Sequence, residues 1–515
     1  MKSEVSASTS SAISQKSEVE TFRRNISTQE SEVRYWRCLP LAERTGSEIF
    51  EVLFRQAGAI ATLLESPYPT PIQPKWQELW DSFPGSGISS QLARYSICAG
   101  APKSTNGKLQ MWTPPVGEIL PFLKQLLSRV NPASTIDSPP VPFTGGWLGW
   151  LGYDVAWEIE QLPRFNLDPL PFPTAFWYEP ENFAVLDHET QKLWLAASDL
   201  SQLDKLEQQL EQSEGRSSRS IIINPKQKTV APHFWTSQID YEAAVRQAKK
   251  YIQAGDIFQT NLSLRFSVPT FADSWSIYKA LQQINPSPMS SYWETPWGAV
   301  ISCSPERLVQ LEGNYAQTRP IAGTRSRGTT DLQDRQLALE LLSNTKERAE
   351  HIMLVDLERN DLGKVSEFGS VNVDELFAIE LYSHVMHLVS NVRGIIRSGC
   401  HPIDLIEAVF PGGTITGCPK VRCMEIIEEL EPVSRNLFYG SCGYLDRRGN
   451  LDLNILIRTL LFGADQETEL NLVWGQVGAG IVADSQPEQE WHESLHKAKA
   501  QLKAIEIANI SSDRG

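Results

Sequence analysis

The sequence predicts an α+β protein with largely antiparallel β-sheets. Segments with the two-residue period of strands and segments with the helical period both occur, but the strand-like segments are bunched and do not alternate strictly with helices. Two polar stretches, 213–220 and 223–229, are the best candidates for a boundary. We therefore expect an N-terminal lobe over about 35–225 and a C-terminal lobe over about 235–507.

Charge and hydropathy exclude several classes of function. The 515-residue chain has 47 Lys and Arg against 62 Asp and Glu, a net charge of −15, and no basic run is longer than two residues. Such a chain is a poor candidate for binding a nucleic-acid backbone. No stretch approaches the roughly 18 consecutive apolar residues that a membrane helix needs. We expect partners that are neither nucleic acid nor membrane.

Cysteine usage and the N-terminus indicate the compartment. The seven cysteines are scattered without a CxxC pair, which argues against a disulfide framework or a zinc site and fits a reducing cytoplasm. Residues 1–20 have no apolar core, so they do not form a secretory signal. Because residues 1–30 are rich in Ser, Glu and Thr, we expect a disordered tail there, followed by a cytoplasmic enzyme.

Each lobe has a recognisable order of elements. In the N-terminal lobe, the glycine density of 145–163 suggests turns or close backbone approach, and 183–198 has the pattern of a hairpin. The C-terminal lobe mixes both periods. Its expected helices are 240–254, 333–358, 403–409, 420–430 and 486–506, and its expected strands are 258–266, 298–310, 386–394, 438–445, 453–462 and 470–482.

The last expected helix carries paired carboxylates. Glu490, Glu493 and Lys497 lie at i, i+3 and i+7, so they share one face, and Ser485 with Glu488 has the spacing of a capping box. Carboxylates one turn apart suit a hard cation such as Mg²⁺, although a solvated acidic face has the same pattern. The preceding segment 477–485 contains Gly478 and Gly480, which free backbone N–H groups for an anion.

A second acidic pair lies on the expected helix 333–358. Glu347 and Glu350 are again one turn apart. Alone they would be read as an exposed pair. Two helices that each carry paired carboxylates would let one metal ion be shared between them.

Three further segments carry candidate groups. Lys420 lies in a first helical turn, where a cation is disfavoured unless a negative ligand binds, although a purely structural loop is equally possible. Glu306 lies in an otherwise apolar strand, where its pKa would rise, unless it pairs with Arg307 or Arg325. His384 and His387 lie near a strand and would more often be satisfied core residues.

Taken together, these segments resemble the chorismate-utilising enzymes, a family with anthranilate synthase component I, aminodeoxychorismate synthase component I, isochorismate synthase and salicylate synthase. The motifs occur in the order of the family and span the C-terminal lobe. A weaker likeness covers 63–66, 92–96 and 145–154. The motifs are FQTNLSLRF (258–266), SPERL (304–308), RPIAGTRSRG (319–328), KERAEHIMLVDLERNDLG (346–363), YSHVMHLVSNVRG (382–394), PGGTITGCPKVR (411–422), NILIRTL (454–460) and VGAGIVADSQPEQEWHESLHKA (477–498).

The resemblance implies a two-lobed fold of antiparallel sheets packed together and flanked by helices, with chorismate and Mg²⁺ between the sheets. By motif, Glu350 and Glu493 would bind Mg²⁺, with Glu347 and Glu490 close by. The metal would hold the ring carboxylate of chorismate. The implied substrate-binding residues are Arg458, Lys497, Gly478, Gly480, Gly323, Thr324 and Gln259.

The same resemblance implies residues at the reacting ring. Glu306 would protonate the leaving C4 hydroxyl, and His387 and Thr414 would contact the ring. Gln259 stands where the water-adding members have a lysine base, so ammonia is expected as the nucleophile. Ala322 stands where aminodeoxychorismate synthases often carry a lysine that attacks C2, whereas anthranilate synthases carry alanine.

The product is therefore open between two readings. Asn261, Arg307 and the segments 410–417 and 440–453 are more like aminodeoxychorismate synthase component I, which is our main expectation. Ala322 favours the alternative, anthranilate synthase component I, which forms anthranilate and pyruvate. A non-catalytic chorismate-binding paralogue is a remote third reading. Because no glutaminase motif is present, we expect a separate glutamine amidotransferase subunit to supply ammonia.

Overall fold

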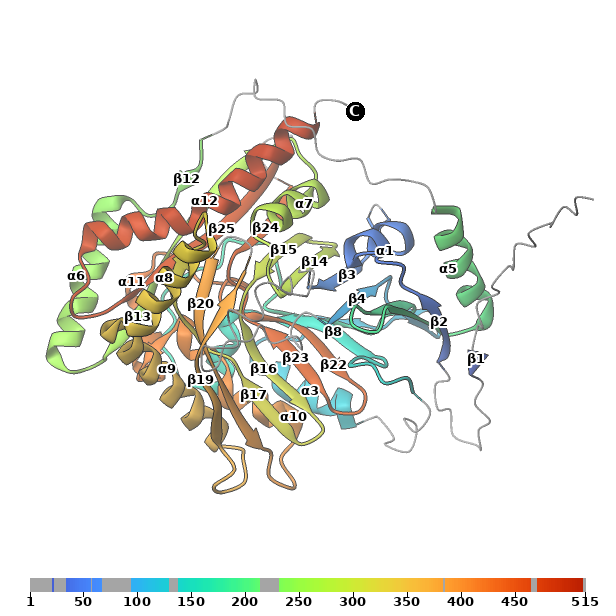
Figure 1. Ribbon diagram of the computed structural model, residues 1–515, viewed down its shortest axis with the longest axis horizontal. Coiled ribbons are helices and arrows are strands. Elements are labelled where there is room, and N and C mark those ends of the chain that lie inside the picture. The colour runs from blue at the N-terminus through green and yellow to red at the C-terminus, as the bar shows by residue number, and fades with distance from the viewer. Residues whose placement is uncertain are drawn as a thin grey trace, which may run out of the picture.

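The computed structural model describes residues 21–22, 34–56, 58–66, 94–128, 138–213, 231–382, 385–464 and 470–512 (Figure 1). Most of the expected tail at 1–30 and of the boundary segments at 213–229 lies outside the described residues, as does His384. The described chain forms two large antiparallel sheets with helices on their outer faces. The prediction of an α+β fold with antiparallel sheets is confirmed.

The larger sheet has 13 strands and joins the two halves of the chain. Its order is β1-β2-β11-β10-β4-β3-β14-β15-β24-β25-β13-β12, with β21 paired to β13. The halves meet where β3 pairs with β14, with Glu65 opposite Ser290. The strands are β1 Thr21–Phe22, β2 Tyr35–Pro40, β3 Ala61–Glu65, β4 Tyr95–Ala99, β10 Phe183–Asp187, β11 Lys192–Ala197, β12 His233–Phe234, β13 Gln259–Thr270, β14 Met289–Thr295, β15 Gly298–Ser304, β21 Gly417–Cys418, β24 Thr459–Ala464 and β25 Asn471–Ile481.

The second sheet has 10 strands and also combines both halves. Its order is β18-β20-β17-β16-β23-β22-β8-β9-β7, with β19 paired to β20. A separate pair is formed by β5 (Ser104–Thr105) and β6 (Lys108–Leu109). The strands of the second sheet are β7 Met111–Trp112, β8 Gly146–Leu151, β9 Ala175–Tyr178, β16 Arg307–Glu312, β17 Tyr315–Thr318, β18 Ile321–Ser326, β19 Asn372–Leu381, β20 Val385–Ile395, β22 Ser441–Asp446 and β23 Leu451–Asn454.

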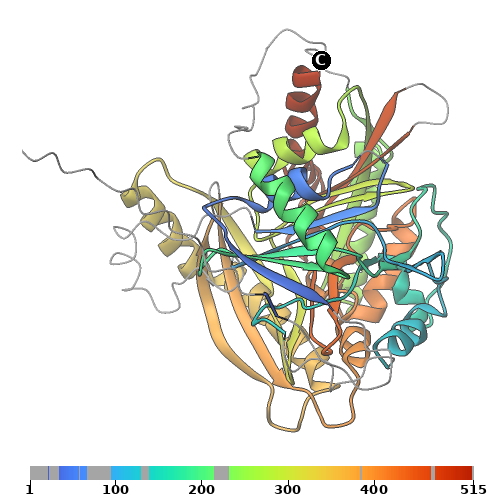
Figure 2. The same cartoon turned by 90° about the vertical axis from the view of Figure 1, so that its right-hand side faces the viewer.

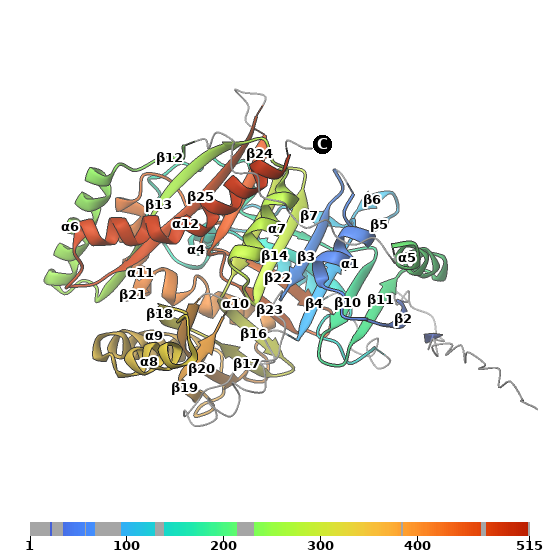
Figure 3. The ribbon, with the colours of Figure 1, turned by 45° about the horizontal axis from the view of Figure 1, so that its top comes forward.

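Helices cover the outer faces of the sheets. The long helix α12 packs with α6 and α7 over β13 and β25 (Figure 3), α8 and α9 lie against β18 and β20, and α5 lies across β2 and β11 (Figure 2). One apolar core fills the space between the sheets and another lies beneath the helices on the larger sheet. The helices are α1 Gly46–Leu53, α3 Ile119–Ser128, α4 Ala156–Ile159, α5 Leu200–Ser213, α6 Gln238–Ala254, α7 Ser274–Ile284, α8 Asp331–Ser343, α9 Thr345–Gly363, α10 Pro402–Val409, α11 Lys420–Leu430 and α12 Pro487–Ser512.

Three expected elements are divided in the structure. The expected helix 333–358 is two helices, because the Asn344 side chain accepts from the N–H groups of Lys346 and Glu347, both at 3.1 Å, and so begins α9. The expected strand 298–310 breaks at Pro305, which has no N–H to donate to a sheet. The expected strand 453–462 breaks before Arg458, whose φ is +53°.

Two local predictions had opposite outcomes. Close backbone approach in 145–163 is confirmed, since a Cβ on Gly149 would lie 2.2 Å from the Phe176 carbonyl oxygen. The capping box of Ser485 and Glu488 is wrong. The Ser485 hydroxyl accepts from the Val482 N–H at 3.1 Å, and α12 begins two residues later.

Candidate active site

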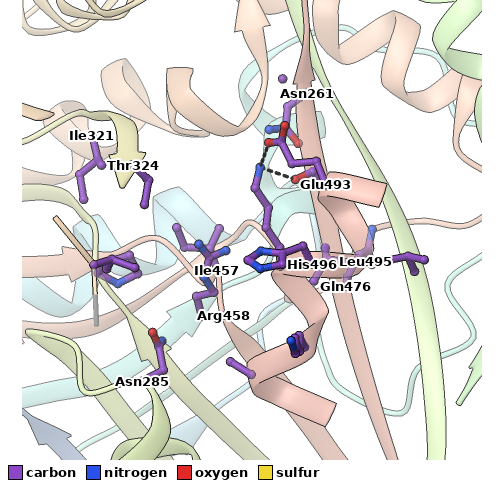
Figure 4. Close-up of a pocket in the computed structure, with 18 of the residues that line it drawn as sticks. Asn261, Asn285, Ile321, Thr324, Ile457, Arg458, Gln476, Glu493, Leu495 and His496 are labelled. Atoms are coloured by element: carbon purple, nitrogen blue, oxygen red, sulfur yellow. Dashed lines mark hydrogen bonds and ion pairs between the residues drawn. The ribbon is translucent and has the colours of Figure 1, made fainter. Parts of the chain in front are cut away.

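A cavity of about 1720 Å³ lies between the two sheets. Strands β13, β18 and β25 and helices α9 and α12 contribute to its wall (Figure 4). Every residue to which the family resemblance assigns a role lines it: Gln259, Glu306, Ala322, Gly323, Thr324, Glu347, Glu350, His387, Thr414, Arg458, Gly478, Gly480, Glu490, Glu493 and Lys497. Segments more than 230 residues apart in the sequence therefore meet at this cavity. The roles of these residues stay predictions.

Four carboxylates lie on one side of the cavity. Glu347 and Glu350 come from α9, and Glu490 and Glu493 come from α12. Burial raises the pKa of Glu350, and the negative charges of the other three carboxylates add to the rise, although Lys346 opposes it. Burial likewise raises the pKa of Glu490, with Glu493 adding to the effect. The acidic pair on α9 therefore interacts electrostatically with the acidic pair on α12.

The chemistry of this acidic cluster (Glu347, Glu350, Glu490 and Glu493) suits a hard cation. Carboxylate oxygens are the ligands that Mg²⁺ prefers, and Glu347 Oε2 is buried without a hydrogen-bond partner. A divalent cation would offset the mutual repulsion that adds to the effect of burial on the pKa values of Glu350 and Glu490. Within the described chain, no three His, Cys, Asp or Glu side chains already form a metal-binding group. The residues fit Mg²⁺ as a donor set, and binding would require their side chains to move together.

Two of these carboxylates form close ion pairs, whereas Glu350 has a more distant partner in Lys346, with Nζ 3.9 Å from Oε1. Arg325 Nη1 lies 2.7 Å from Glu347 Oε1, and Lys497 Nζ lies 2.8 Å from Glu493 Oε1. Lys497 also donates to the Gly478 carbonyl at 3.0 Å. A metal ion would compete with both ion pairs and would release Lys497 toward a ligand anion.

Glu306 is a buried acid in the wall of the same cavity. It is 5% exposed, and burial raises its pKa to about 8. The charge of Glu358 adds to the rise, whereas Thr414 and Arg458 oppose it. With this pKa Glu306 is largely protonated at pH 7 and can give a proton to a leaving group.

The alternative that Glu306 pairs with a neighbouring arginine is wrong. Arg307 donates to both carboxylate oxygens of Asp452 at 2.8 Å. Arg325 pairs with Glu347 and with Glu340. Among the described residues neither arginine pairs with Glu306, and the cation that lowers its pKa is Arg458.

His387 is an uncharged histidine in the cavity wall. Its Nδ1 lies 2.9 Å from the Thr324 hydroxyl, and burial, assisted by Arg458, lowers its pKa to about 4. The hydroxyl of Thr414 lies next to Glu306, where it opposes the rise in the pKa of that carboxyl. A neutral imidazole and a hydroxyl therefore line the same cavity as the acid Glu306.

Cationic groups in the cavity wall suit an anion. Burial lowers the pKa of Arg458, and nearby Glu306 and Glu493 oppose the shift. Arg458 forms no ion pair within the described ranges. Its backbone is left-handed, and its side chain lines the cavity wall. Position 478 requires glycine, because a Cβ there would lie 2.4 Å from the Leu262 carbonyl oxygen. An anionic group would satisfy the unpaired guanidinium.

Lys420 does not contact this cavity. Its Nζ lies 2.5 Å from Asp361 Oδ2 and donates to the Val409 carbonyl at 2.9 Å. The cation in the first turn of α11 is thus matched by a protein carboxylate. The expectation of a bound anion at this helix end is wrong.

The sequence reasoning assigned no site role to two wall residues. Tyr439 is 5% exposed and has a φ of +65°. Asn261, used only to separate family members, faces the cavity because it lies two residues from Gln259 on β13. That two-residue period was a usable signal for Asn261, whereas no local pattern marks Tyr439.

Comparison with known proteins agrees with this geometry. An anthranilate synthase component I-like protein of Synechocystis sp. is 58% identical, covering 92% of each chain. Aminodeoxychorismate synthase component 1 of Bacillus subtilis is 43% identical over 82% of this chain and 91% of its own. The crystal structure of anthranilate synthase component I from Streptococcus pneumoniae superposes with a TM-score of 0.67 at 31% identity, covering 84% of this chain and 97% of that one.

The described helices offer no candidate for a membrane span, since none combines the necessary length and apolarity.

The family of chorismate binding enzymes matches residues 92–503, which is most of the chain and includes all the cavity residues assigned above. The chain belongs to the chorismate binding enzyme family.

Proposed function

We propose that this protein is a Mg²⁺-dependent synthase that aminates chorismate with ammonia and forms anthranilate and pyruvate. The observation that carries the proposal is Ala322 in the cavity wall, in a chain whose 58% identical relative is named anthranilate synthase component I-like. Alanine offers no amine for covalent attack at C2, which leaves this carbon to ammonia in the proposed reaction. The comparisons thus favour anthranilate over our main sequence-based expectation, 4-amino-4-deoxychorismate.

The chain's own groups supply the proton transfers. As the C2–N bond forms and the C4–O bond breaks, Glu306 protonates the C4 hydroxyl, which leaves as water. Loss of the C2 proton and of pyruvate then makes the ring aromatic. His387, with its pKa lowered to about 4, is uncharged and free to accept a proton.

Substrate binding uses both ends of the cavity. Arg458 and Lys497, with the backbone at Gly478 and Gly480, would bind the enolpyruvyl carboxylate. Glu350 and Glu493, with Glu347 and Glu490 close by, would hold Mg²⁺. When bound there, Mg²⁺ supplies Lewis acidity toward the ring carboxylate.

The second candidate is 4-amino-4-deoxychorismate synthesis, in which ammonia replaces the C4 hydroxyl and pyruvate stays attached. It is supported by the 43% identity to the Bacillus subtilis aminodeoxychorismate synthase component 1. Asn261, which lines the cavity, also favours it. Free ammonia could take the place of the lysine amine that Ala322 lacks.

Ammonia would come from a separate glutamine amidotransferase subunit. Two similar proteins are named as a component of a synthase, which supports a partner for this chain. The isolated chain should then be active with ammonium salts and inactive with glutamine. Glutamine-dependent turnover by the purified chain alone would refute a separate subunit.

One experiment tests the product. The purified chain is incubated with chorismate, MgCl₂ and ammonium chloride, and the products are identified by mass spectrometry. Anthranilate with an equal amount of pyruvate is the expected result. Accumulation of 4-amino-4-deoxychorismate would establish the second candidate, and unconsumed chorismate would overturn both and favour a non-catalytic paralogue.

A further inference from the structure

Arg435 is a buried arginine behind the cavity wall. It is 2% exposed and is held by the carboxylate of Glu431, with Nε to Oε2 at 2.9 Å and Nη2 to Oε1 at 2.7 Å. Glu431 in turn accepts from the N–H and the hydroxyl of Ser263 on β13, at 2.8 and 2.7 Å. The ion pair is therefore anchored to the larger sheet.

The same guanidinium reaches two backbone segments that carry cavity residues. Its Nη1 donates to the Ile415 carbonyl at 2.9 Å, next to Thr414. Its Nη2 donates to the carbonyl of Asn261 at 2.8 Å. Thr414 and Asn261 both line the cavity, so one side chain fixes two parts of its wall.

Arg435 also lies between two aromatic rings. Its guanidinium carbon is 4.6 Å from the ring centre of Tyr439 and 4.7 Å from that of Tyr153. Tyr439 lines the cavity, and Tyr153 follows β8 in the N-terminal half. A planar cation held between two rings fixes their separation as well as their orientation.

The turn that carries Tyr439 needs such support. Asn436 and Tyr439 both have positive φ values, +51° and +65°, which are unfavourable for residues with a Cβ. Backbone of this type persists when its surroundings determine it. Arg435 stands at the start of this turn and contacts the ring at its end.

We propose that Arg435, held by Glu431, is a positioning residue that fixes Thr414, Asn261 and Tyr439 around the bound substrate. The inference deepens the proposed function and rests on it. A buried ion pair contributes little net stability compared with a well-packed apolar pair. The N–H groups of the Arg435 guanidinium point in fixed directions and so hold the surrounding groups in place. A lysine ammonium cannot reproduce this arrangement.

The test compares Arg435→Lys with Arg37→Lys in the full chain. Arg37 is a matched control, because it is 8% exposed and pairs with Asp204 and Glu207, and none of these three residues lines the cavity. Steady-state kinetics with chorismate, MgCl₂ and ammonium chloride are normalised to the folded fraction from circular dichroism. We expect kcat per folded enzyme to fall roughly 10- to 100-fold in Arg435→Lys and by less than about twofold in Arg37→Lys.

An equal loss in both variants, or an unchanged kcat in Arg435→Lys, would overturn the positioning role. A crystal structure of Arg435→Lys gives a readout that does not depend on activity. Displacement of the Ile415 and Asn261 carbonyls or of the Tyr439 ring supports the proposal, and an unmoved wall refutes it. Wild-type enzyme without turnover would instead count against the proposed function alone.

Discussion

A Cβ placed on Gly323 would lie 2.4 Å from Oε2 of Glu347. Gly323 has a φ of +63° and occupies an irregularity in the pairing of β18 with β20, between Ala322 and Thr324. The missing side chain thus makes room for a carboxylate of the acidic cluster. Gly323 therefore affects the acidic cluster, where we propose that Mg²⁺ binds, through space as well as through its backbone conformation.

Gly323→Ala should therefore weaken Mg²⁺ binding. The methyl group would displace the Glu347 carboxylate, and the concentration of MgCl₂ giving half-maximal activity should rise by roughly tenfold. Gly313→Ala is the matched control, since Gly313 has the same φ of +63° and nothing within 4 Å of its Cβ position. Both variants carry the same backbone strain, so a similar metal dependence in the two would contradict the steric explanation.

Loss of a metal-binding carboxylate should abolish activity. Glu350→Gln and Glu493→Gln each remove a charge from the acidic cluster, and chelation of Mg²⁺ by EDTA should have the same effect on the wild type. Glu488→Gln, an exposed carboxylate in the first turn of α12, serves as the control and should keep wild-type turnover. Normal turnover in Glu350→Gln or in EDTA would rule out the proposed metal site.

The fold was predictable as far as local patterns reach. Periodicity placed α6, α10 and α11 to within a few residues, because each has an apolar face and clear ends. It missed the division at Asn344, since nothing in the apolar pattern distinguishes an internal cap from a continuous helix. Periodicity also could not predict that both halves of the chain contribute strands to both sheets, because strand partners are set by long-range packing.

The site shows the same division between local and long-range information. Family motifs placed fifteen residues that all line one cavity. The raised pKa of Glu306 was expected from its apolar strand, and burial is the main cause in the structure. Lys420 pairs with Asp361, 59 residues away, and Arg435 donates to the Asn261 carbonyl, 174 residues away, so spacing along the chain gave no sign of these two contacts.

Glu306→Gln should reduce catalysis far more than substrate binding. An amide cannot protonate the leaving hydroxyl, so kcat should fall roughly 100- to 10,000-fold with little change in the KM for chorismate. In the wild type the acid is active when protonated. With a pKa of about 8, activity at a fixed concentration of uncharged ammonia should fall by about tenfold per pH unit above pH 8.

That pH profile needs ammonia held constant, because the uncharged fraction of ammonium solutions rises with pH. The Glu306→Gln variant should show no loss above pH 8, since its side chain does not ionise. A wild-type rate that stays level between pH 7 and 10 would exclude Glu306 as the acid.

The raised pKa of Glu306 also predicts a pH-dependent stability. A carboxyl that holds its proton more tightly when folded stabilises the fold most below its unfolded pKa of about 4.3. This contribution is lost as pH rises through about 8. The Tm of Glu306→Gln minus that of the wild type should therefore increase from pH 5 to pH 9. Glu358, whose pKa burial raises to about 7, is present in both proteins, so its own titration largely cancels. A constant difference would contradict a raised pKa.

Ala322→Lys should change the product. A lysine amine at this position of the cavity wall could attack C2 of chorismate as the C4 hydroxyl leaves as water. Ammonia would then add at C4 as the C2–lysine bond breaks, so the new product is 4-amino-4-deoxychorismate. Mass spectrometry should show this compound rising at the expense of anthranilate and pyruvate. Ala322→Met adds comparable bulk without an amine and should lower the rate while keeping anthranilate as the product. If both variants lose activity with an unchanged product, position 322 sets only the shape of the cavity, and the choice between C2 and C4 must lie with other wall residues such as Asn261.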